Sequence, residues 1–167
     1  MHYPGEHLLP GQLGYFFVVL SLVASLVATF SYFKATTSKI QEDTVYWKRL
    51  ARWSFIIESV SVFAIFGLLI YILTQHLFEY KYAWQHSSKT LEFKYIFASI
   101  WEGQEGSFLL WSFWHCILGL ILIKTGKQWE APVMTVVSFA QFCLGTMIIG
   151  IYIFNQKLGS NPFVLLR

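Results

Sequence analysis

Four long apolar segments constrain this chain of 167 residues more than any other feature. They span about residues 13–33, 53–73, 107–123 and 133–154, and the first, third and fourth contain no Asp, Glu, Lys or Arg. Each segment approaches the roughly 20 residues that an α-helix needs to cross about 30 Å of hydrocarbon. Because a bilayer cannot solvate open backbone groups, such segments are expected to be helices. The sequence therefore predicts an all-α, polytopic membrane protein with a single region of four transmembrane helices.

The composition agrees with lipid as the solvent. Charged residues make up only 13% of the chain, whereas a soluble domain typically carries about a quarter. The net charge of +3 is too small and too scattered to indicate a nucleic-acid partner. Cys116 and Cys143 lie in apolar runs and form no CxxC or CxxCH motif. Zinc fingers, thioredoxin-like sites and covalently attached haem are therefore excluded as interpretations of these cysteines.

Basic residues indicate how the helices are oriented. Residues 1–12 contain no Lys or Arg, unlike the start of a secretory signal, so the first segment is expected to stay as a helix. The connectors on one side, residues 34–52 and 124–127, carry seven basic residues, and the other side carries five. Since basic loops favour the cytoplasm, both termini are expected on the outer, periplasmic side.

Polar residues near the second segment allow two interpretations. Glu58 lies about 8 Å inside the segment by helical rise, where a carboxylate often marks a proton relay or an ion site. The favoured alternative is that Glu58 pairs with a basic residue of the first connector at the cytoplasmic interface. His76 and His115 are expected to differ in depth by roughly 12 Å. That spacing makes them a poor pair of haem ligands, and His115 is expected to be a satisfied histidine inside the bundle.

The most distinctive stretch is residues 101–111, an acidic, glycine-bearing turn that leads into the third segment. Gly103 and Gly106 permit tight backbone turns, and Ser107 is expected to cap the helix with Glu105 near the positive end of its dipole. Two interpretations remain open: a capped helix start beside an aromatic belt, or a flat aromatic site for a planar amphipathic ligand. The preceding loop, residues 79–97, is expected to lie along the outer membrane surface. Pro132 is expected to begin the fourth helix.

The stretch 101–111, WEGQEGSFLLW, resembles the WGxxEGSLLLW signature of the CcmF family of cytochrome c-type biogenesis proteins, which are haem-handling membrane proteins related to CcsA. A second element, SNPF at residues 160–163, similarly follows the fourth helix in that family. Glu102 stands where the family commonly has glycine, and Gln104 where it commonly has histidine. The positions that match the family motifs are Trp101, Glu105, Gly106, Ser107, Trp111, Ser160, Asn161, Pro162 and Phe163.

The resemblance implies a function in cytochrome c assembly at a bacterial-type inner membrane. The full assembly would be a haem lyase that receives haem from a haem chaperone and attaches it covalently to apocytochrome c, together with other maturation proteins. This segment would act as scaffold and outer-facing wall. Residues expected on its haem-side surface are Trp101, Glu105, Trp111 and His115.

Ligation is expected of the full assembly rather than of this segment. The family's haem-ligating histidines and its tryptophan-rich motif lie beyond the SNPF element, so no catalytic residue and no metal ligand is expected here. The chain is therefore expected to be the N-terminal part of a longer protein or a split subunit. The alternatives are a small b-type cytochrome or quinone-linked membrane subunit, and a transporter fragment that uses Glu58.

Overall fold

A computed structural model of the chain describes residues 7–153 and 156–166. Four long helices dominate it, α1 (Leu8–Thr37), α2 (Gln41–Thr74), α5 (Gln104–Thr125) and α6 (Glu130–Ile149). Two short helices, α3 (Lys81–His86) and α4 (Phe93–Ala98), and the 3-10 turn η1 (Ser99–Trp101) join α2 to α5. A second 3-10 turn, η2 (Lys127–Trp129), precedes α6, and a hairpin of β1 (Ile151–Ile153) and β2 (Gln156–Leu158) follows it.

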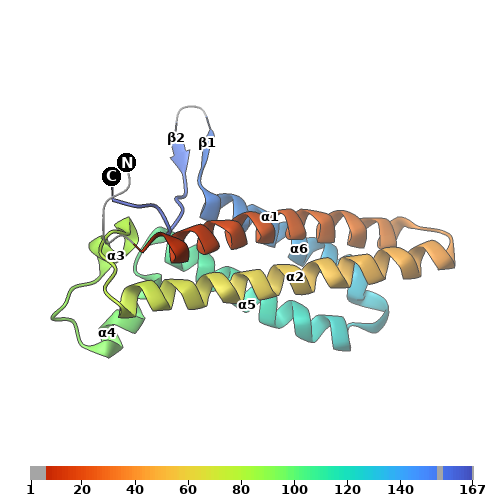
Figure 1. Ribbon diagram of the computed structural model, residues 1–167. Coiled ribbons are helices and arrows are strands. Elements are labelled where there is room, and N and C mark those ends of the chain that lie inside the picture. The colour runs from red at the N-terminus through yellow and green to blue at the C-terminus, as the bar shows by residue number, and fades with distance from the viewer. Residues whose placement is uncertain (1–6, 154–155, 167) are drawn as a thin grey trace.

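The long helices form an antiparallel bundle in which each packs against two others (Figure 1). α1 and α5 both lie between α2 and α6. All four are long and apolar enough to cross a membrane, which confirms the predicted all-α class and the number of spanning segments. Small side chains on α1 permit this close packing, and Ser21, Ala24, Ser25 and Ala28 are all buried.

Two of the helices are longer than their apolar segments. Residues 34–52 were expected to be a connector, but α1 continues to Thr37 and α2 begins at Gln41. No glycine or proline interrupts this stretch, so both helices extend into it and leave only residues 38–40 between them. The 34 residues of α2 extend over about 51 Å, well beyond the roughly 30 Å of a bilayer core.

The predicted fourth segment, 133–154, was wrong at both ends. α6 begins at Glu130, so Pro132 is its third residue and not its first, and it ends at Ile149. Gly150 then takes a φ of 78°, which residues with a side chain rarely adopt, and the chain enters the hairpin. Ile151 pairs with Leu158 and Ile153 with Gln156. Hydropathy cannot separate this short apolar strand from a helix end; Phe154 itself lies outside the described residues.

Both ends of the bundle have a distinct character. We call one the motif end; it holds α3, α4, η1, the starts of α1 and α5, and residues 160–166 (Figure 1). The other, which we call the basic end, holds residues 38–40 and η2, where the predicted basic connectors lie.

Candidate functional site

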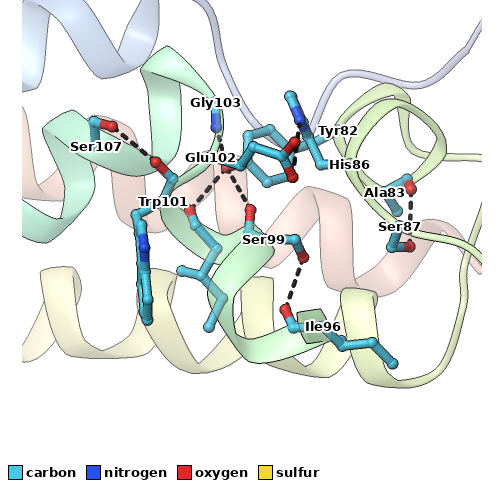
Figure 2. Close-up of polar contacts among 11 residues, drawn as sticks. Tyr82, Ala83, His86, Ser87, Ile96, Ser99, Trp101, Glu102, Gly103 and Ser107 are labelled. Atoms are coloured by element: carbon cyan, nitrogen blue, oxygen red, sulfur yellow. Dashed lines mark hydrogen bonds and ion pairs between the residues drawn. The ribbon is translucent and has the colours of Figure 1, made fainter. Parts of the chain in front are cut away.

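Tyr82 organises the turn that leads into α5. Its buried hydroxyl lies 2.7 Å from the Ile100 carbonyl oxygen and 3.1 Å from that of Ser99, and it accepts a 3.4 Å hydrogen bond from the Gly103 N–H (Figure 2). Burial raises the pKa of Tyr82 above its usual range, so the hydroxyl stays protonated and able to donate. One side chain of α3 thus fixes both η1 and the start of α5.

The two glycines of residues 101–111 lie where other atoms leave little room for a side chain. A Cβ on Gly106 would overlap the Ile100 carbonyl oxygen and the Tyr82 hydroxyl. A Cβ on Gly103 would approach the Tyr82 ring to 2.8 Å and His86 Nε2 to 2.9 Å. Neither Gly103 nor Gly106 has a positive φ. The prediction that they are needed for tight backbone turns was therefore wrong; they are needed because a side chain would not fit.

Ser107 does not cap α5 as expected. The helix begins three residues earlier, with Gly103 at its N-cap. The Ser107 hydroxyl instead donates a 2.9 Å hydrogen bond to the Trp101 carbonyl oxygen and ties η1 to the first turn of α5 (Figure 2). Glu105 lies in that first turn, as expected for the positive end of the helix dipole.

The SNPF element is anchored at the same motif end. Asn161 Oδ1 accepts a 2.9 Å hydrogen bond from the Phe163 N–H, and the Phe163 ring packs where a Cβ on Gly14 of α1 would lie. The Val164 carbonyl accepts a hydrogen bond from Lys81 N–H (2.9 Å), and Leu166 N–H donates to the Glu79 carbonyl (2.7 Å).

Residues 79–82 therefore join the two family motifs. Tyr80 pairs with Leu165 in a β-bridge, and its hydroxyl accepts a 2.9 Å hydrogen bond from the Gly11 N–H of α1. Two residues later, Tyr82 holds the signature turn. Neither tyrosine was predicted to have this role. No pattern in the sequence separates them from the other aromatic residues of the segment 79–97, because both contacts are made with residues far away in the chain or in the next turn.

The predicted haem-side residues lie on two elements at this end. Trp101 is on η1 and is 39% exposed, and Trp111 of α5 is 60% exposed. His115 follows Trp111 by four residues, so the two share one face of α5. His115 is not the satisfied histidine that was expected, because its buried Nδ1 has no hydrogen-bond partner. None of these residues lines the open apolar groove of about 630 Å³ that lies between α1, Tyr80 and residues 163–165.

Glu58 does not pair with a basic residue, which corrects the favoured interpretation. The cations of α2 instead bind Glu130, a buried residue of α6. Arg52 Nε and Nη2 lie 2.6 and 2.7 Å from its two carboxylate oxygens, and Lys48 Nζ lies 2.9 Å from Oε2. The fourth helix was expected to begin at Pro132, so Glu130 was not assigned to it and this pairing was not predicted.

These residues provide aromatic surface. The exposed indoles can lie against a planar apolar molecule. Within residues 7–153 and 156–166, no group of three His, Cys, Asp or Glu side chains could hold a metal ion.

No protein-family model and no curated protein matches this sequence. Among solved structures, the cytochrome c heme lyase CcmF superposes on it with a TM-score of 0.80 at 21% sequence identity. The match covers 100% of this chain and 26% of that chain. The resemblance predicted from residues 101–111 and 160–163 is thus confirmed at the level of the fold.

Proposed function

We propose that this chain serves cytochrome c assembly as a scaffold segment of a haem lyase. The proposal rests on one observation: the whole chain has the same fold as a part of CcmF. The same likeness favours this function over a b-type cytochrome or a transporter. Membrane insertion by four helices agrees with it.

The motif end would form an outer-facing wall beside a haem site completed elsewhere. Both family motifs meet there and are held together by residues 79–82. The exposed rings of Trp101 and Trp111 supply flat apolar surface. We place this end on the periplasmic side of a bacterial-type inner membrane, where a haem chaperone and apocytochrome c would be met. Haem would be bound by the assembly, with its iron ligands outside this chain.

Deletion of the encoding gene tests the function directly. We expect covalent haem staining of c-type cytochromes to disappear in membranes of the deletion strain and to return with the intact gene. Normal staining without the gene would refute the proposal.

A paired substitution tests the wall. Trp101→Ala combined with Trp111→Ala should lower covalent haem staining several-fold while protein abundance is maintained. The control is Trp129→Ala, which removes an exposed indole, 65% accessible against 60% for Trp111, from η2 at the basic end. Equal loss of staining in both variants would mean that the motif end has no special role.

A further inference from the structure

A polar cluster lies inside the bundle, away from both ends. It consists of Glu58 and Ser59 on α2, Ser112 and Cys116 on α5, and Gln141 on α6. Gln141 Nε2 donates to the Ser112 carbonyl oxygen at 3.1 Å and to Cys116 Sγ at 3.0 Å. The Glu58 side chain contacts Gln141, and that of Cys116 contacts Ser59. Three helices thus meet through side chains that lipid cannot solvate.

Glu58 is the only acidic group in this cluster, and no cation faces it. Its side chain is 2% exposed, and none of the ion pairs among the described residues includes it. Arg52, the nearest basic residue toward the start of α2, is engaged by Glu130. An ionised carboxylate in this position would carry a large cost of desolvation with nothing to offset it.

Two buried oxygen atoms of this cluster lack a hydrogen-bond partner, and a single proton between them could supply one for both. Glu58 Oε2 has none, and neither has Gln141 Oε1. The Gln141 amide nitrogen is directed at Ser112 and Cys116 and also interacts with the Glu58 carboxyl, whereas its oxygen is left without a donor. A carboxylate cannot donate to it, whereas a protonated carboxyl carries one O–H donor. One proton on Glu58 would therefore satisfy both atoms.

We propose that Glu58 is a membrane-embedded proton-binding site, whose protonated carboxyl donates a hydrogen bond to the Gln141 amide oxygen and so joins α2 to α6. Loss of the proton would remove this hydrogen bond and leave a bare charge between three helices. The site does not depend on the proposed role in cytochrome c assembly, and it involves no transport across the membrane.

The groups around Glu58 agree with this assignment. On α5 the titratable neighbour is Cys116, a buried thiol, and on α6 it is the uncharged Gln141. On α1 the buried Tyr32 interacts with Arg52 and Glu130 and not with Glu58. No neighbouring charge thus competes for the proton.

Infrared spectroscopy of the purified full chain in a detergent that contains no carbonyl group tests the proposal. A protonated carboxyl has a carbonyl stretching band above the amide I band, whereas a carboxylate has none there. At neutral pH we expect such a band in the wild type and its loss in Glu58→Gln. The matched control Glu42→Gln, which changes an exposed carboxyl of the same helix, should leave the band in place.

A second variant tests the partner without removing the acid. Gln141→Leu should keep the band but move it to higher frequency, because the carbonyl of a carboxyl freed from a hydrogen bond is stiffer. Absence of the band in the wild type at neutral pH would overturn the proton-binding site. A band with unchanged frequency in Gln141→Leu would overturn the bond to Gln141. Because the wild-type spectrum is decisive by itself, misfolding of a variant cannot rescue the proposal.

Discussion

At the scale of single residues, a few polar atoms and missing side chains decide how the motif end is built. The Tyr82 hydroxyl forms hydrogen bonds with two carbonyl groups and one N–H, and Gly106 lets the start of α5 approach η1. The resemblance to the family marked Gly106 but gave no physical reason for it. The structure supplies the reason: the space for a methyl group is already occupied.

Tyr82→Phe should destabilise the protein by about 1–3 kcal/mol, since it leaves buried backbone groups without a partner. Thermal unfolding of the detergent-purified protein measures the loss. Tyr95→Phe is the control, because it removes a hydroxyl from an exposed side chain. Equal stability of the two variants would contradict the role of Tyr82.

Gly106→Ala should be far more harmful than Gly67→Ala. A Cβ on Gly106 would overlap backbone, whereas one on Gly67, inside α2, meets nothing within 4 Å. Alanine favours a helix over glycine by about 1 kcal/mol, so Gly67→Ala should be neutral or stabilising. The unfolding temperature should fall in Gly106→Ala and stay the same or rise in Gly67→Ala, each compared with the wild type. A mild effect at Gly106 would show that η1 can shift.

At the scale of elements, the bundle is joined by different interactions at different depths. Tyr80 and Tyr82 connect the helix starts at the motif end, and the ion pair of Arg52 with Glu130 connects α2 to α6 toward the basic end. Between them the helix surfaces are apolar or small, apart from the cluster around Glu58. Hydropathy locates such helices but says little about which of their polar residues face one another.

Arg52→Gln should cost about 2–4 kcal/mol, somewhat less than for a fully enclosed pair because the Arg52 side chain is 44% exposed. The reason is that Glu130, only 1% exposed, would keep Lys48 alone as its partner. Chemical or thermal unfolding in detergent gives the value. Lys94→Gln breaks the exposed pair with Glu92 and should cost less than about 1 kcal/mol. A loss at Arg52 no larger than at Lys94 would contradict the inference.

At the scale of the whole molecule, the fold separates a motif end from a basic end. Seven basic residues lie in or close to the two connectors of the basic end. The basic end is therefore expected in the cytoplasm and the motif end outside. This arrangement would put residues 101–111 and 160–163 on the outer side, as the proposed function requires.

Labelling of single cysteines tests this orientation. In a background with Cys116 and Cys143 replaced by alanine, Lys89→Cys should react with a membrane-impermeant maleimide added to intact cells whose outer membrane has been opened. Lys39→Cys, at an exposed position of the basic end, should react only after the inner membrane is broken. The reverse pattern would place the motif end in the cytoplasm.

The sequence by itself determined the class of protein and the location of its helices. A run of about 20 predominantly apolar residues has one stable form in lipid, so the four long helices follow from composition and length, including the second, which carries Glu58. The signature at 101–111 and the SNPF element indicated the family because both are local strings of residues. The same local reasoning failed at Gly150, where one backbone conformation ends α6 and turns an apolar stretch into a strand.

Only the tertiary structure decided how distant residues meet. Tyr82 and Ile100, Tyr80 and Gly11, and Arg52 and Glu130 are 18 to 78 residues apart along the chain. Periodicity and hydropathy report which face of a helix is buried, but not the rotation and depth at which two helices face each other. Packing sets that register. For this reason Glu58 lies against Gln141 of α6 and not against a nearby lysine or arginine, and the signature turn depends on a tyrosine outside its own motif.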